Sequence, residues 1–124
     1  MSSEIAYQFQ IRLGNGSLID SYSVSSQSAN QSVAALVRNV QSVSTAAGGD
    51  ALGLGGVITP GYAIFSNLDA TNYIEIGSNV AATFYPFMKL LPGEESGPIR
   101  LSIAAPYARA NTLAVSLFYI IYNS

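Results

Sequence analysis

Acidic side chains are the main candidates for chemistry in this chain, because it contains neither histidine nor cysteine. Disulfides, thiolate zinc sites, cysteine nucleophiles and histidine-based triads are thereby excluded. Glu94 and Glu95 form the only adjacent acidic pair, and such a pair could bind Ca²⁺ or act as acid and base. The pair follows Pro92-Gly93, however, and that position favours a solvated turn.

A second acidic pair, Asp69 and Glu75, falls in one corner region of the sequence. A Ca²⁺ site needs more oxygen ligands at close spacing than these two carboxylates supply. Asp69 follows Asn67-Leu68, and Asn and Asp side chains at such corners bond to their own backbone. We therefore expect a structural cap here, and we expect the chain to have no catalytic residues, no metal site and no cofactor.

Two glycine-rich segments and the tyrosines are the remaining candidates for a small-molecule site. Gly14–Gly16 and Gly53–Gly56 neither follow a strand-to-helix pattern nor precede Lys-Ser or Lys-Thr, so phosphate binding is not indicated. The eight tyrosines could form a sugar-stacking platform, as in carbohydrate-binding modules. The chain has no tryptophan, and most tyrosines alternate with expected core positions, which favours packing in a core or an interface.

Charge is unusually scarce, at 10% of residues against roughly 25% in an average domain. Two explanations stay open. Either much of the outer surface is covered in an oligomer or assembly, or the Ser-rich stretch over residues 17–45 supplies the polarity. The net charge is −2 and the five cations are scattered, so the sequence has no electrostatic footprint for nucleic acid.

The sequence gives no sign of a membrane segment. Its N-terminus lacks a basic region followed by an apolar stretch, so we expect no signal peptide. The longest run of large apolar residues, Leu117–Tyr122, is far too short to cross a bilayer as a helix.

The N-terminal region is expected to form a β-hairpin. Ile5–Leu13 alternates apolar and polar residues without a miss, which predicts a half-buried strand. Gly14-Asn15-Gly16 follows and favours a tight turn. Leu18, Tyr22 and Val24 then fall on one face of a second strand, interrupted by Asp20.

The segment Val33–Val43 fits two structures. Its valines and Leu36 can form a helical stripe, and its β-branched, Ser-rich composition fits a strand equally well. We favour a strand, because no strong cap or acidic first turn supports a helix. Gly48–Gly56 holds five glycines and predicts a flexible loop with one short strand over Leu52–Leu54.

From Thr59 onward, turn signals recur every 8–12 residues, which is typical of a sandwich or barrel. Pro86 places its strand at a sheet edge or a bulge. The last strand has large apolar residues on both faces, so both faces are expected to be covered. We predict one all-β domain over residues 1–124, a jelly-roll-like β-sandwich of eight or nine strands. The expected strands of this part are Tyr62–Ser66, Tyr73–Gly77, Ala82–Leu90, Pro98–Ala104 and Thr112–Tyr122, with a loop over Ala105–Asn111.

Four segments of the C-terminal half follow one another in a distinctive order. A Gly-Tyr strand over Pro60–Phe65 leads into an Asn-Leu-Asp corner and an Asn-Tyr-Ile-Glu-Ile-Gly strand over Asn67–Gly77. Phe87–Glu94 carries an apolar-Lys-Leu-x-Pro-Gly-Glu pattern, and Ala105–Ala110 carries Pro-Tyr-Ala-Arg-Ala. This order resembles small β-sandwich proteins encoded among the virion genes of tailed bacteriophages. The turn over Glu94–Pro98 departs from that pattern, because it is longer and more polar.

The resemblance implies a virion structural component: a capsid cement (decoration) protein, or a small tail or neck protein. It implies a non-enzymatic role on the surface of a phage particle, for a protein made in the host cytoplasm. The expected partners are other copies of the chain, as a homotrimer, and the major capsid protein, with no nucleic acid and no membrane. A carbohydrate-binding sandwich for host attachment is the alternative from another class. An exposed aromatic row would favour sugar binding, and a broad, poorly charged apolar patch would favour a cement protein.

Tyr107 and Arg109 are the expected contact residues for a neighbouring subunit or the shell. They stand in an otherwise small-residue loop, and Tyr and Arg are enriched at interface hot spots. The competing interpretation is that Tyr107 packs inward under its own loop.

Overall fold

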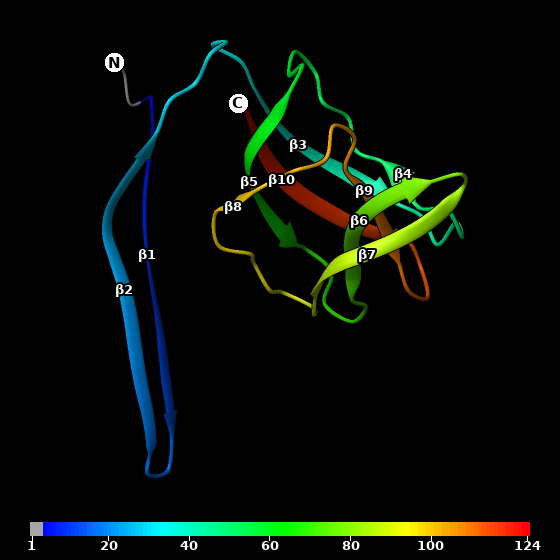
Figure 1. Cartoon of the computed structure of the whole chain (residues 1–124). Coiled ribbons are helices and arrows are strands. Elements are labelled where there is room, and N and C mark those ends of the chain that lie inside the picture. The colour runs from blue at the N-terminus through cyan, green and yellow to red at the C-terminus, as the bar shows by residue number, and fades with distance from the viewer. Residues whose placement is uncertain (1–3) are drawn as a thin grey trace. The chain divides into compact units, whose positions relative to one another are not determined.

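Strands make up the regular structure of residues 4–124, the part of the chain that the computed structural model describes (Figure 1). No helix occurs within these residues, so the predicted all-β class is confirmed. Residues 4–124 contain ten strands, whereas eight or nine were predicted. They are β1 (Ile5–Asn15), β2 (Leu18–Ala29), β3 (Leu36–Val43), β4 (Asp50–Ala51), β5 (Pro60–Asn67), β6 (Ile74–Val80), β7 (Thr83–Leu90), β8 (Ile99–Arg100), β9 (Tyr107–Ala110) and β10 (Val115–Asn123).

The chain divides into two compact units, the first ending at Ser32 and the second spanning Val33–Ser124. The expectation of one domain over residues 1–124 stays a prediction. Strands β1 and β2 of the first unit pair only with each other. We call this hairpin, Ile5–Ala29, the arm, and the second unit the body.

The arm confirms the predicted hairpin. β1 and β2 are antiparallel, and Gly16 supplies the positive φ at the turn between them. The register shifts once, between Tyr7 and Phe9. At that bulge Ser25 and Ser26 of β2 lie opposite a single residue of β1.

The prediction that Ile5–Leu13 is half buried was wrong. Within the arm only Ile5 is buried, and Ile11 and Leu13 are 65% and 45% exposed. The alternation that normally marks one buried face is present, but the arm is a two-stranded ribbon without a further sheet in its own unit to cover that face.

The strands of the body pair in a nested order. β3 pairs with β10, β4 with β9, β5 with β8 and β6 with β7, all antiparallel. Two further pairings, β5 with β10 and β6 with β9, join them into sheets of order β3-β10-β5-β8 and β4-β9-β6-β7. Consecutive strands therefore lie in different sheets at every step except from β6 to β7.

One hydrophobic core joins the two sheets. Phe65, Leu117 and Tyr119 come from the first sheet, and Ile74 and Ile76 come from the second; all five are 0% exposed. The hydroxyl of Tyr119 reaches the end of this core, where it donates to the Gly53 carbonyl oxygen at 2.7 Å. The core thereby also fixes the glycine-rich segment after β4.

The strand prediction for Val33–Val43 is confirmed, since β3 covers its C-terminal part. The predicted loop Ala105–Asn111 was wrong, because β9 occupies Tyr107–Ala110 and pairs with both β4 and β6. The sequence pattern of β9 is weak because its core-facing residues, Ala108 and Ala110, are small; they lie opposite Ile76 and Ile74 of β6.

Two other predicted strands were misplaced. The short strand expected over Leu52–Leu54 lies at Asp50–Ala51, and the strand expected over Pro98–Ala104 is reduced to Ile99–Arg100. Leu52 and Leu101 supply the apolar signal in each case. Both are buried in the core from positions just beyond the paired residues.

Pro86 occupies the position that its chemistry predicts. β7 is the last strand of its sheet, and the register shifts between Ile76 and Gly77, opposite Met88 and Pro86. A Cβ on Gly77 would collide with the Tyr85 carbonyl oxygen, so the bulge requires glycine there.

Among the described residues, none forms a helix with the length and apolarity needed to cross a membrane.

Candidate interaction surfaces

The arm has one apolar face and one polar face. Side chains directly opposite one another in an antiparallel pair point to the same side. The register therefore places the predicted apolar residues of β1 on the same side as those of β2. We call this side the apolar arm face, and it consists of Ile5, Tyr7, Phe9, Ile11, Leu13, Leu18, Tyr22 and Val24.

Much of the apolar arm face is exposed. Leu18 and Tyr22 are 60% and 59% exposed, and Phe9 is 38% exposed. The rings of Tyr7 and Phe9 stack at 6.5 Å between centroids, and Phe9 lies 6.3 Å from Tyr22. The arm thus presents a continuous aromatic and aliphatic strip. Among the residues of β1 and β2 that face this side, Asp20, opposite Leu13, is the one that carries a charge.

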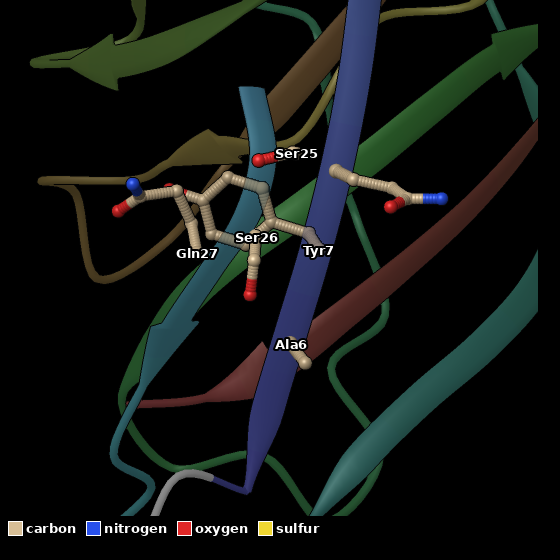
Figure 2. A pocket seen from close by; sticks show the side chains of 6 residues that line it. Ala6, Tyr7, Ser25, Ser26 and Gln27 are labelled. Atoms are coloured by element: carbon tan, nitrogen blue, oxygen red, sulfur yellow. The ribbon is translucent and has the colours of Figure 1, made fainter.

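A shallow depression lies at the bulge of the arm (Figure 2). Figure 2 shows the ring of Tyr7 reaching from β1 across to β2, near Ser26 and Gln27. Its lining holds no acid or base, so the depression offers stacking and neutral hydrogen bonds only. The lining residues are Ala6, Tyr7, Gln8, Ser25, Ser26 and Gln27.

The first sheet of the body, β3-β10-β5-β8, has a second apolar surface on the side away from the core. Phe118 and Ile120 of β10 alternate with the core residues Leu117, Tyr119 and Ile121, so they point outward. Their partners in β3 and β5 share that side. We call this the outer apolar face, and it consists of Leu36, Val40, Tyr62, Ile64, Phe118, Ile120 and Tyr122.

The outer apolar face is only partly covered. Leu36 and Val40 are 53% and 54% exposed, whereas Ile120 is 8% exposed. The sequence predicted that both faces of the last strand would be covered; the inner face is buried, and Phe118 and Tyr122 on the outer face are half-buried.

Two arginines, Arg38 and Arg100, lie on the same side of the sheet as the outer apolar face. The guanidinium of Arg38 lies 5.9 Å from the ring centroid of Phe118, and that of Arg100 lies 4.5 Å from the centroid of Tyr62. Each can interact with its ring through a cation–π contact. Within residues 4–124 the one salt bridge is Arg109–Glu75, so neither Arg38 nor Arg100 is neutralised by a carboxylate of the described chain.

The second sheet, β4-β9-β6-β7, carries the predicted site residue Arg109 on its outer side. Its Nη2 donates to Glu75 Oε1 at 3.2 Å, and its Nη1 donates to the Ala47 carbonyl oxygen at 3.1 Å. The guanidinium also lies 4.7 Å from the ring centroid of Phe84. These contacts commit Arg109 to its own chain, where it ties the segment before β4 to β6 and β7.

Tyr107 lies on the same side of β9 as Arg109, two residues away. It is half-buried and outside the hydrophobic core. Its backbone pairs with Gly77 on one side and Ala51 on the other. The structure therefore brings the two predicted contact residues onto one surface, where Arg109 already contacts Glu75, Ala47 and Phe84 of its own chain.

Asp69 serves as the structural cap that the sequence predicted. Its Oδ2 accepts hydrogen bonds from the backbone N–H of Asn72 at 2.6 Å and of Thr71 at 2.9 Å. These bonds, led by that of Asn72, lower the pKa of the Asp69 carboxyl below its ordinary value of 3.8. Asn67 extends the corner, because its Oδ1 accepts from the Asp69 N–H at 2.9 Å.

The acidic pair Glu94 and Glu95 lies in a turn, as expected. The Oε1 of Glu94 accepts from the Leu91 N–H at 2.7 Å, and Gly93 takes a positive φ between them. Within residues 4–124, no three acidic side chains gather closely enough to hold a metal ion.

The sequence did not predict the apolar arm face or the outer apolar face as exposed surfaces. The alternation of β1 was interpreted as a half-buried strand, and the two-sided apolar pattern of β10 as a strand covered on both faces; neither prediction located an exposed apolar surface. Comparison of the chain with protein-family models, curated proteins and solved structures gave no match.

Proposed function

We propose that this chain is a non-enzymatic structural component of a phage virion, acting as a capsid cement protein that bridges neighbouring capsid subunits. In this role it would associate with itself, as a homotrimer, and with the major capsid protein on the particle surface. A protein that binds only the assembled shell stabilises that shell by mass action, without any catalytic step.

The exposed apolar arm face is the observation that carries the proposal. A contiguous apolar patch of several hundred Å² is the usual mark of a protein interaction site. The apolar arm face joins aromatic and aliphatic side chains over the whole length of a hairpin. The chain has only 10% charged residues, so few charges oppose the burial of its apolar surfaces in an assembly.

The nested strand order supports a jelly roll for the body. Pairing β3 with β10, β4 with β9, β5 with β8 and β6 with β7 corresponds to one long hairpin rolled into two sheets. Jelly rolls are common in viral capsid and lectin domains. The architecture thus agrees with the virion protein that the motifs of the C-terminal half resemble, and fold alone does not set function.

Sugar binding is the second candidate, because the stacked rings of Tyr7 and Phe9 form a short aromatic row with Tyr22. A sugar site also needs polar groups that converge on the ligand. Most side chains next to this row, Ile11, Leu13 and Leu18, cannot bond to hydroxyl groups. The polar exceptions are Gln27, opposite Tyr7, and Asp20, opposite Leu13, and they lie far apart along the arm. The row therefore fits an apolar protein surface better than a carbohydrate.

The test is to purify phage particles from cells that carry this gene and to quantify the chain against the major shell protein. We expect it to co-sediment with intact heads in a fixed ratio to the shell protein and to be released when heads are dissociated. A chain found only in the cell lysate would contradict the proposal. Co-sedimentation with isolated tails would move it to the tail or neck, and retention by a glycan array would favour host attachment.

A further inference from the structure

We propose that copies of this chain join by arm exchange: the apolar arm face of one copy docks on the outer apolar face of the β3-β10-β5-β8 sheet of a second copy. This inference rests on the proposed function, in so far as that function requires self-association. It names the two surfaces that meet and the copy that each comes from.

The two surfaces match in length and in chemistry. The apolar residues of β1 run from Ile5 to Leu13, and β10, at the centre of the receiving face, has 9 residues. At about 3.3 Å per residue both strips are roughly 30 Å long. Each is built from aliphatic and aromatic side chains, so a ribbon laid on the sheet would form a further layer about 10 Å away, as in packed sheets.

Charge favours the pairing of these two faces. Asp20 is the charged residue on the apolar arm face, and Arg38 and Arg100 stand on the side that receives it. Asp20 and Arg38 are exposed, and neither forms an ion pair within residues 4–124. Pairing two arm faces with each other would bring two aspartates into one apolar layer and would leave the outer apolar face uncovered.

The outer side of the other sheet is a poorer receiver. Its centre is occupied by the Arg109–Glu75 salt bridge, and Lys89 lies opposite Glu75 in the register of β6 and β7. Covering these charges with an apolar ribbon would remove them from water without a new partner, which is costly. The β3-β10-β5-β8 sheet therefore offers the better receiving side, even though β7 of the other sheet also exposes Tyr85 and Phe87.

When each copy gives its arm to one neighbour and receives the arm of another, arm exchange is a heterologous contact, whereas reciprocal exchange between two copies gives a two-fold dimer. Heterologous contacts close into rings or extend through a lattice, depending on the rotation between copies. A closed ring of three copies would be the homotrimer proposed above. Every copy in the ring would then have both apolar faces covered.

Engineered cysteines test the proposal directly, since the native chain has no thiol. One preparation carries Ile11→Cys and is labelled with ¹⁵N; the other carries Val40→Cys and is unlabelled. Both positions are more than half exposed, at 65% and 54%, so neither change empties the core. The two are refolded together, treated with a short bismaleimide and digested, and the linked peptides are identified by mass spectrometry.

We expect the link between labelled position 11 and unlabelled position 40 to exceed the link between two copies of position 11 by about tenfold, a difference of roughly 1.4 kcal/mol. The matched control is Gln10→Cys, on the polar side of the same strand, which should link to position 40 about tenfold less. Thr83→Cys, exposed on β7 of the other sheet, is the matched control for the receiving position.

Three results would overturn arm exchange. Predominant links between two copies of position 11 would mean that arms pair with each other. In a chain carrying both cysteines, a link whose yield stays unchanged on dilution would mean that it forms within one copy. Persistent oligomers without links to position 40 would place the contact elsewhere.

The charge contribution has its own test. Asp20→Lys and Arg38→Glu should each weaken self-association, and the two changes together should restore it to within a factor of two or three, as expected for coupled residues. Arg12→Glu, on the polar side of the arm, is the control and should leave association unchanged. Double-variant association no better than either single variant would overturn the predicted approach of Asp20 to Arg38.

Failure of this inference and failure of the proposed function give different results. Arm exchange in purified protein that is absent from phage particles would reject the virion role alone. Stoichiometric presence in particles without any link between positions 11 and 40 would reject arm exchange alone.

Discussion

Arg109 shows how a residue type that favours interfaces can be used within its own chain. Arginine suits contact sites because it combines a fixed charge, several donors and a planar face. Here Glu75, the Ala47 carbonyl oxygen and the ring of Phe84 use all three properties. Arg109 is therefore better explained as a brace of the second sheet than as a contact for a partner.

Replacing Arg109 with Ala should lower the free energy of unfolding by about 1–2 kcal/mol, because a cation–π contact and a partly exposed ion pair are lost together. Urea denaturation followed by circular dichroism measures this change. Arg12→Ala, an exposed arginine of the arm, is the control and should fall within about 0.5 kcal/mol of the parent. Unchanged stability combined with lost self-association would restore Arg109 as an interface residue.

Asp69 predicts how the fold responds to acid. Its pKa is lowered in the folded state, so the folded chain holds its proton less tightly than the unfolded chain does. The stabilising effect of the carboxylate is then complete above the unfolded value of 3.8 and is lost as the pH falls through the lower, folded pKa. Acid should therefore weaken the Asn67–Asn72 corner.

Asp69→Asn provides the comparison, because the amide keeps an acceptor oxygen and does not titrate. The parent should be more stable than the variant from pH 4 to 7, and the difference should shrink as the pH is lowered below 3.8. Urea denaturation at a series of pH values measures it. A difference that stays constant down to pH 2 would show that the carboxylate charge plays no part.

Among the elements, the arm and the body differ in what stabilises them. Every residue of the body's core cluster lies between Val43 and Ile121, and none belongs to the arm. A two-stranded hairpin is marginally stable alone in water. The arm thus depends on being covered by other protein, whereas the body has a core of its own.

A chain that begins at Val33 should therefore fold with nearly the melting temperature of the full chain. Because the hydrophobic core remains complete, we expect a change below about 1 kcal/mol in unfolding free energy. Thermal circular dichroism on dilute samples of both chains measures it. A fall of many degrees would mean that the arm is part of the body's cooperative unit.

At the scale of the whole molecule, we expect a trimer or higher oligomer. The apolar arm face and the outer apolar face both expose large apolar side chains, and large exposed apolar patches mark interaction sites. Light scattering over a range of concentrations measures the mass, and Ile11→Ser combined with Tyr22→Ser should lower it. A mass equal to one chain, 13.0 kDa, at all concentrations would contradict self-association in solution. The two apolar faces could then be buried only by assembly on the virion.

Local sequence patterns were enough to predict the all-β class, the N-terminal hairpin, a strand within Val33–Val43 and an edge or bulge position for Pro86. Each of these depends on local chemistry: alternation along a strand, positive φ at glycine, and the missing N–H of proline. The Asp69 corner was predictable for the same reason, since an Asx side chain bonds to backbone only a few residues away.

Which apolar faces are buried depends on contacts between strands that are distant in the sequence. Alternation in β1 shows that one side is apolar, but what covers that side depends on strands far away in sequence. The tertiary structure also places Ala108 and Ala110 in a strand, because their small side chains lie opposite Ile76 and Ile74 of a neighbouring strand. The partner of Arg109, 34 residues away in Glu75, was hidden for the same physical reason: a long-range contact leaves no local pattern in the sequence.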